Sequence, residues 1–243
     1  MYGRRVIAYL TVFCLVFVLL PDAHAKRYEN SKPNYTNAFI VLAGGVATAG
    51  VFHIIYSMLS KQQPGTQMPS GSTTGHNLLI SGDFGKRFFV AGEDVGDLTA
   101  GTPIGLSLRY QWGTGKKTIS SLGLFYRTAE HVGKESAAGY VFKMSKIGFT
   151  LGGFKRSLKA TWDWDFGAGI VLSEYQEQGT KESGGALMLT NIGTGLGIRI
   201  SDRITVGPRV EWSDWTYLND TFSWEWNNLI STEILLQGTF SLF

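Results

Sequence analysis

The stretch KATWDWDFGAGIVLSEY, residues 159–175, carries the signal that decides the fold. Successive side chains of a β-strand point to opposite faces, so alternate residues share a surface. One surface of this strand is apolar and comprises Ala160, Trp162, Trp164, Phe166, Ala168, Ile170 and Leu172. The other is polar or small and comprises Lys159, Thr161, Asp163, Asp165, Gly167, Gly169 and Ser173. Soluble β-sandwiches also use strands with one apolar face, but those strands rarely exceed ~10 residues.

The first 25 residues have the composition of a secretory signal peptide. Arg4 and Arg5 precede an apolar run over residues 6–20, and a small-x-small sequence ends at Ala25. We expect cleavage after Ala25. The alternative is an uncleaved membrane anchor, but the run is shorter than the ~20 residues that a span needs.

Composition excludes several functions for the mature chain. The single cysteine, Cys14, lies in the signal peptide, so disulfides and thiol chemistry are excluded. Loss of Arg4, Arg5 and Asp22 lowers the net charge from +3 to +2, which is too weak to indicate nucleic-acid binding. No group of residues has metal-ligand spacing and no phosphate loop is present, so we expect no metal and no cofactor.

Eight segments with period two follow one another from residue 77 to the end of the chain. The links between them are short near residues 113–117, 152–156 and 201–203, and long and polar near residues 91–101, 129–138, 175–184 and 214–226. Short and long links alternate, as they do in antiparallel outer-membrane barrels with tight periplasmic turns and longer outer loops. We therefore predict an all-β fold, an eight-stranded up-and-down barrel over residues 77–243, in the outer membrane of a Gram-negative bacterium.

The barrel assigns the two faces of the opening stretch. Trp162, Trp164 and Phe166 are predicted to face outer-membrane lipid, and Asp163 and Asp165 to face the lumen. In a soluble sandwich the apolar face would be the interior instead. The segment at residues 140–151 changes phase between Met144 and Ile147, which predicts a β-bulge.

In pattern and length, residues 77–243 resemble the small eight-stranded outer-membrane barrels of the OmpA and OmpX type. Such proteins often end on a phenylalanine that the barrel-assembly machinery reads, and this chain ends SLF. The resemblance implies that machinery as a partner. Phe243 has the parity of the polar face, however, whereas Phe240 and Leu242 have that of the lipid face. Either a second bulge near the end corrects the parity, or the terminal signal is a weaker one.

Polar side chains of both charges are predicted to line the lumen. They are Asp83, Arg87, Arg109, Arg127, Lys159, Asp163, Asp165, Arg199, Arg209, Glu211 and Glu233. The interior of an eight-stranded barrel is just wide enough for side chains to fill, and isolated buried charges are costly. We expect a salt-bridged core, with a narrow water-filled pore as the alternative.

The segment before the barrel has a different pattern. Polar residues 26–36 precede a hydrophobic helix predicted over residues 37–60, and a flexible linker over 61–76 leads to the first strand. The apolar stretch of 22 residues from Ala38 to Leu59 would span ~33 Å as a helix. Its small residues, spaced for close helix packing, are Ala43, Gly45, Ala47, Ala49 and Gly50.

The linker, at most ~60 Å long when extended, is expected to be too short to cross the periplasm. Three placements of the helix follow: against the barrel or a partner in the outer membrane, in self-association, or in a complex at the periplasmic rim. A helix with no special role is the fourth reading.

Two groups near the outer rim are candidate sites. His131 lies near Ser136 in the sequence. Lipid A deacylases carry a histidine two residues before their catalytic serine, but here the residue two positions after His131 is Gly133, so the motif is absent. The last long link is rich in aromatic residues, among them Trp215, Tyr217, Trp224 and Trp226. They are typical of an interfacial aromatic girdle, or they form a platform for sugars or a protein partner.

These observations favour a structural, anchoring or adaptor role in a cell-envelope assembly. The alternatives are a narrow passive channel for ions or small solutes and an enzyme that modifies lipid A or phospholipid. Barrels of this size serve many functions, so the fold by itself does not select one.

Overall fold

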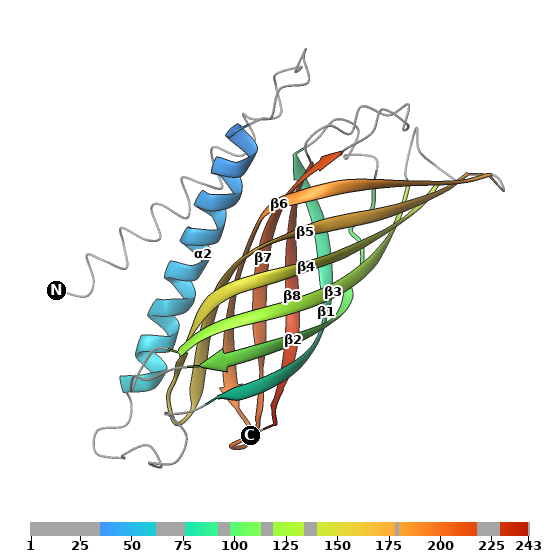
Figure 1. Cartoon of the computed structure of the whole chain (residues 1–243). Helices are drawn as coiled ribbons and strands as arrows, with labels where there is room; N and C mark the ends of the chain where they lie inside the picture. The colour runs from blue at the N-terminus through green and yellow to red at the C-terminus, as the bar shows by residue number, and fades with distance from the viewer. Residues whose placement is uncertain are drawn as a thin grey trace.

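The computed structural model describes residues 35–61, 76–91, 98–112, 119–133, 140–177, 180–217 and 229–242. Eight strands form a closed antiparallel barrel in which each strand pairs with its neighbour in the chain and the first pairs with the last (Figure 1). They are β1 (Asn77–Ala91), β2 (Ile104–Trp112), β3 (Ile119–Val132), β4 (Val141–Arg156), β5 (Ala160–Glu177), β6 (Thr180–Arg199), β7 (Ile204–Tyr217) and β8 (Leu229–Ser241). The predicted eight-stranded barrel is therefore confirmed.

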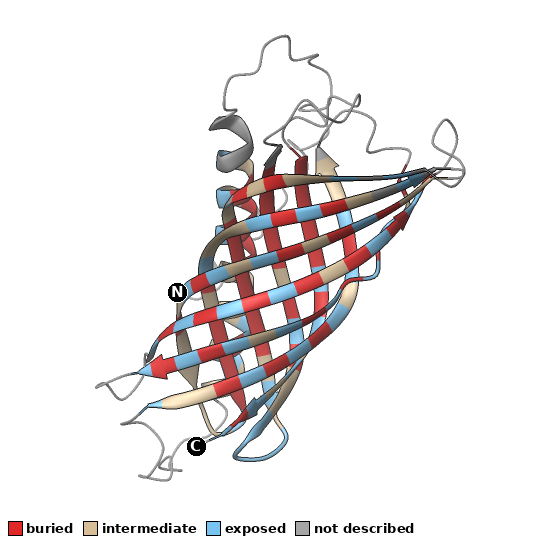
Figure 2. Cartoon of the chain, turned by 45° about the vertical axis from the view of Figure 1, so that its right-hand side comes forward, coloured by how far each residue is buried: buried red, intermediate tan, exposed pale blue. Residues whose placement is uncertain are grey.

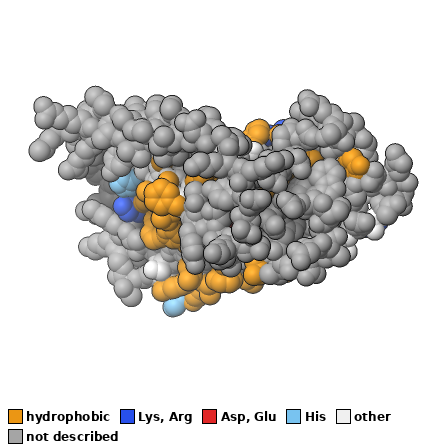
Figure 3. Space-filling model, turned by 90° about the horizontal axis from the view of Figure 1, so that it is seen from above, with side chains coloured by type: hydrophobic (Ala, Val, Ile, Leu, Met, Phe, Trp, Pro, Cys, Tyr) orange, Lys and Arg blue, Asp and Glu red, His pale blue; other side chains and the backbone are white. Residues whose placement is uncertain are grey.

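Alternation of outward and inward side chains follows the sequence period of two (Figure 2). On β2, Ile104 and Leu106 point outward and are each 64% exposed, whereas Gly105 and Arg109 between and after them are buried. Seen from the long-loop rim, some of the hydrophobic side chains of the wall are visible at the edge of the molecule (Figure 3). This apolar outer wall is what a lipid environment requires.

The bulge predicted between Met144 and Ile147 is wrong. β4 pairs with β3 and with β5 residue by residue through this segment, without a shift of register. Phe142 and Met144 are buried inside the barrel, while Ile147 points outward. The apparent change of phase arises because the lumen at this end is filled by apolar side chains, so both faces of the strand carry hydrophobic residues.

The long polar loop predicted near residues 175–184 is also wrong. β5 continues to Glu177 and β6 begins at Thr180, so the two strands form a long hairpin that extends beyond the rest of the barrel (Figure 1). Lys181 lies 3.0 Å from Glu174 across this hairpin. The polar residues of this segment therefore belong to solvent-exposed strands and not to a loop. At the opposite rim, β4 likewise continues through the link predicted near 152–156 and ends at Arg156.

The hydrophobic helix α2 (Tyr35–Lys61) lies on the outer wall of the barrel, along β5, β6 and β7 (Figure 1). Among the three predicted placements, the structure thus has the helix against the barrel. Val41 packs on Ile192, Trp212 and Ile230 near the long-loop end, and Tyr56 packs near Ala160 at the short-turn end. The helix therefore runs from the long-loop rim to the short-turn rim.

Small residues let the helix approach the wall closely. Gly45 and Ala47 are buried against the barrel, and a methyl group at Gly45 would overlap Ile192. Ala43, Ala49 and Gly50 are half-buried, so the predicted packing residues divide between the contact face and its edges. Leu42 and Val46 point away from the barrel, and Val46 is 57% exposed.

Polar groups on the outer wall are covered by the helix. The indole Nε1–H of Trp212 donates to Thr48 Oγ1 at 3.3 Å, and Thr48 Oγ1 donates to the Gly44 carbonyl at 2.7 Å. Trp162, predicted to face lipid, points outward but is only 9% exposed because His53 and Tyr56 cover it. Its Nε1–H donates to Thr194 Oγ1 at 3.2 Å.

Length and composition would let α2 cross a membrane, since Phe39–Ser60 spans 22 residues with a mean hydropathy of 1.9. Several predicted features lie outside the described residues: the signal peptide 1–25, most of the linker and Phe243. No register shift separates β7 from β8, so the second bulge is absent from the described part of β8. β8 does shift against β1, between Phe89 and Ala91 at the opposite rim.

Replacing Gly45 by valine tests the close contact between helix and wall. Gly45→Val adds volume where Ile192 leaves no room, so we expect the free energy of unfolding to fall by about 1–3 kcal/mol. Urea unfolding in detergent micelles measures it. Val46→Leu adds volume on the exposed face and serves as the control. Equal stability of both variants with the wild type would contradict the docked position of α2.

Candidate functional site

The lumen gathers charged side chains from several strands, and its first layer joins β2, β5 and β7. Arg109 Nη1 lies 2.6 Å from Asp163 Oδ2, and its Nη2 lies 2.7 Å from Asp165 Oδ2. Arg209 reaches the same two carboxylates, at 2.9 Å from Asp163 and 2.7 Å from Asp165. Two arginines thus share two aspartates across the barrel axis, and each aspartate accepts charge-assisted hydrogen bonds from both arginines.

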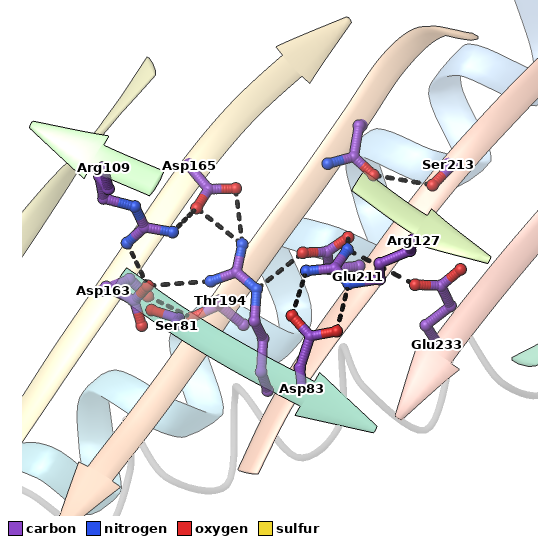
Figure 4. Close-up of polar contacts among 12 residues, drawn as sticks. Ser81, Asp83, Arg109, Arg127, Asp163, Asp165, Thr194, Glu211, Ser213 and Glu233 are labelled. Carbon is purple, nitrogen blue, oxygen red and sulfur yellow. Dashed lines mark hydrogen bonds and ion pairs between the residues drawn. The ribbon is translucent and has the colours of Figure 1, made fainter. Parts of the chain in front are cut away.

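A second layer lies next to the first and is connected to it by Arg209, whose Nε donates to Glu211 at 2.7 Å. Arg127 also pairs with Glu211, and its Nε lies 2.7 Å from Asp83 Oδ1 (Figure 4). These contacts bring together β1, β3 and β7. The bidentate contact of Arg127 with Asp83 fixes the plane of the guanidinium.

The third part of the network centres on Glu233 of β8. Arg87 Nε lies 2.6 Å from Glu233 Oε1, and Lys146 Nζ lies 2.8 Å from the same oxygen. Lys146 also donates to Ser213 Oγ at 3.2 Å, and Ser213 donates to Asn191 Oδ1 at 2.7 Å. All three charged side chains are fully buried, so each depends on the others for compensation.

The described lumen network balances its charges, with five cations against five carboxylates. The cations are Arg87, Arg109, Arg127, Lys146 and Arg209, and the anions are Asp83, Asp163, Asp165, Glu211 and Glu233. A charge removed from water and left unpaired is strongly destabilising, whereas this arrangement gives every group an opposite partner.

Glycines inside the barrel make room for the long charged side chains. A Cβ at Gly193 would overlap Arg209 and Asp165, one at Gly195 would overlap Asp163, and one at Gly105 would overlap Arg127. Glycine in a strand often marks such a close approach. The glycine-rich polar face of β6 therefore has a packing reason: it is the space that the arginines fill.

Above the charged layers, the long-loop end of the lumen is closed by an apolar plug. Its buried members are Leu98, Phe125, Phe142, Met144, Val171, Ala186, Met188, Trp215 and Leu229. Trp215 is 0% exposed, meets Phe89 edge-on at 5.4 Å and has the Arg87 guanidinium 5.3 Å from its ring centre. The prediction that Trp215 forms a surface platform is wrong, because its parity on β7 is that of the lumen.

The other predicted binding residues are not placed in a surface site. The side chain of Tyr217, and all of Trp224 and Trp226, lie outside the described residues. Of the aromatic residues at the start of this segment, Trp212 points outward but is covered by α2, so it is not part of a girdle in contact with lipid.

His131 is buried inside the barrel next to the plug. Its Nδ1 lies 3.0 Å from the Thr99 carbonyl, and its ring lies 4.8 Å from Phe89. Ser136, its predicted partner, lies outside the described residues. In the described part of the chain, no three histidine, cysteine or acidic side chains are placed to hold a metal ion.

Three residues differ from their predicted surroundings. Lys159, predicted to line the lumen, is exposed in the turn before β5. Arg199 lies apart from the central network, at the short-turn rim, where it donates to the Ser157 carbonyl at 3.1 Å and pairs with Asp202 at 2.8 Å. Lys146 belongs to the network although sequence reasoning missed it. The signal was its even register with Phe142 and Met144, which the supposed bulge concealed.

The short-turn end of the lumen contains a small polar cavity of about 20 Å³. Ser81, Arg109, Asp163, Gln237 and Thr239 contribute to its lining. This is about the room that one water molecule needs. The cavity ends at the first charged layer, where Arg109 pairs with Asp163.

A closed antiparallel sheet of eight strands with an apolar outer wall defines the small outer-membrane β-barrel, and the chain has this fold. No protein-family model matches the chain, and no curated protein matches it either.

Among solved structures, Neisserial surface protein A is similar with a TM-score of 0.49 and 9% identity, over 69% of this chain and 97% of that one. The attachment invasion locus protein Ail of Yersinia pestis has a TM-score of 0.43 and 16% identity, over 69% and 99%. The outer membrane protein OprG of Pseudomonas aeruginosa has a TM-score of 0.37 and 10% identity, over 71% of this chain and 98% of that one. These values carry no argument about function, and the fold rests on the pairing of the strands themselves.

Neutralising Glu233 tests the energetic weight of the network. Glu233→Gln leaves Arg87 and Lys146 buried with reduced compensation, so we expect the free energy of unfolding to fall by about 3–5 kcal/mol. Urea unfolding in micelles, followed by intrinsic fluorescence, measures the change. Glu174→Gln removes an exposed ion pair and should leave stability unchanged. If Glu233→Gln unfolded with the same free energy as the wild type, the network would not be a main source of the stability of the barrel.

Proposed function

We propose that this protein is a non-conducting outer-membrane barrel that anchors a cell-envelope assembly in a Gram-negative bacterium. Its short-turn rim faces the periplasm and its long-loop rim faces the outside. The observation that carries the proposal is the filled lumen. A barrel that transports solute needs an open path, whereas here the charged layers and the apolar plug occupy the interior in succession.

Both parts of the filling oppose ion passage. The charged side chains of the network are at most 10% exposed, and each is paired with an opposite charge. An ion that entered would have to displace those pairs. The plug presents aliphatic and aromatic surface to an ion that must leave its hydration shell, which is a barrier in itself. The passive channel therefore gains no support from the described residues.

The lipid-modifying enzyme gains no support from His131. The imidazole contacts Phe89 and the Thr99 carbonyl inside the wall, and its exposed fraction is 0%. A general base must come within hydrogen-bond reach of the proton that it abstracts, and a substrate at the membrane surface has no approach to this ring.

Anchoring is supported by the parts of the chain that extend past the apolar wall. Leu172 is the last outward apolar residue on β5, and the strand continues to Glu177, about 17 Å further. Outward side chains beyond this level are polar, with Glu174 and Lys181 paired across the hairpin. A hairpin that extends past the apolar wall is suited to contact with a partner outside the membrane.

Electrical recording tests the closed lumen. In planar bilayers we expect no steady conductance from the refolded protein, because the charged layers and the plug leave no continuous path. A pore former of known conductance in the same bilayer is the positive control. Steady conductance that changes when Arg109 is replaced by glutamine would contradict the proposal, because it would show that ions pass through the lumen.

Shortening the hairpin tests the anchoring role. Glu174 and Ser183 are paired across the strands, so an Asn-Gly turn in place of residues 175–182 joins them without altering the barrel. We expect envelope proteins that co-purify with the wild type from gently solubilised membranes to be lost from this variant. Lys86→Gln, a change at the same rim, should retain them. If nothing co-purifies with the wild type, the assembly proposal fails.

A further inference from the structure

The short-turn rim carries mostly positive charge among the described residues, in contrast to the opposite rim. The rim residues are Lys155, Arg156, Lys159, Arg199 and Arg203, with Asp202 as the acidic member. At the long-loop rim the described outward and exposed charges are mixed: Lys86, Glu130, Lys143, Glu174 and Lys181. The described residues therefore present a basic surface at one rim and a near-neutral one at the other.

Part of this basic cluster is structural. Arg156 Nη2 donates to the Asp202 carbonyl at 2.6 Å, so it connects the end of β4 to the turn after β6. Arg199 donates to the Ser157 and Leu158 carbonyls and pairs with Asp202 at 2.8 Å. Together these two arginines connect the two turns, and Asp202, the acidic residue among the described rim residues, is paired with Arg199. The remaining cations, Lys155 and Lys159 in particular, lie outside this internal pairing.

Lys155 has the position of a residue that reaches toward lipid headgroups. It lies on the outward face of β4, two positions beyond Gly153 and four beyond Leu151, which is 53% exposed on the apolar wall. Its ammonium lies 5.3 Å from the centre of the Trp162 ring and 3.3 Å from His53 Nε2 on α2. Tryptophan and lysine together at the end of an apolar wall are typical of a membrane interface.

We propose that Lys155 and Lys159 bind the phosphodiester headgroup of an anionic phospholipid in the inner leaflet, beside the lower end of α2. The inference rests on the proposed insertion in the outer membrane. Headgroup phosphate is the anion present at this level, and Lys155 faces the lipid side of the wall and not the aqueous centre of the rim. Charge complementarity selects an anionic headgroup over a zwitterionic one.

Lipid spin-label spectroscopy tests the preference. The refolded protein is placed in phosphatidylcholine vesicles that contain trace spin-labelled phosphatidylglycerol or spin-labelled phosphatidylcholine, and the motionally restricted fraction of each probe is measured. We expect the wild type to hold phosphatidylglycerol with about fivefold preference, and the preference to disappear in the Lys155→Gln/Lys159→Gln double variant.

The control is Lys86→Gln/Lys143→Gln, which removes the same charge from the opposite rim and should keep the preference. Heat-dependent mobility on detergent gels shows separately whether each variant is folded in the vesicles. A barrel that does not insert would contradict the proposed function. An inserted wild type without preference, or a double variant that retains it, would overturn the lipid site alone.

Discussion

The structure depends on one constraint: the lumen of an eight-stranded barrel has room for side chains and little else, so every charge that points inward must find a partner there. Arg109 and Arg209 satisfy it by sharing Asp163 and Asp165, and Arg87 and Lys146 by sharing Glu233. The glycines opposite these side chains follow from the same requirement. Because the five cations and five carboxylates of the network balance, each of these buried groups has an opposite partner.

A second constraint applies to the outer wall: polar groups that face lipid need hydrogen-bond partners, and the helix covers some of these groups. An unpaired polar group in lipid is costly, and the part of the wall beneath the helix carries the hydroxyl of Thr194 and the indole N–H groups of Trp162 and Trp212. Trp162 donates to Thr194 and Trp212 donates to Thr48 of α2, so these groups are paired beneath the helix. The helix is thus part of the barrel wall and not an attachment to it. Its direction, from the long-loop rim to the short-turn rim, also follows from these contacts.

Much of the barrel could be predicted because lipid imposes a strict period of two on the outward face. β2 and the lower half of β5 follow that period, and their inward residues lie where the sequence predicted them. The errors arose where lumen and water departed from the simple rule. Phe142 and Met144 point into an apolar plug, so an unbroken strand resembled a bulged one. The polar hairpin residues near Lys181 resembled a loop because strand residues in water are polar as well.

The sequence by itself determined the strand number, the two faces of each strand and the presence of a helix long enough to cross a bilayer, because these depend on local periodicity and length. Tertiary structure decided which charges pair, where Trp215 points and which wall the helix covers. Such choices depend on the register between strands that are distant in the chain: Arg87 meets Glu233 only because β1 closes the barrel against β8. A pattern of alternating residues contains no information about that closure.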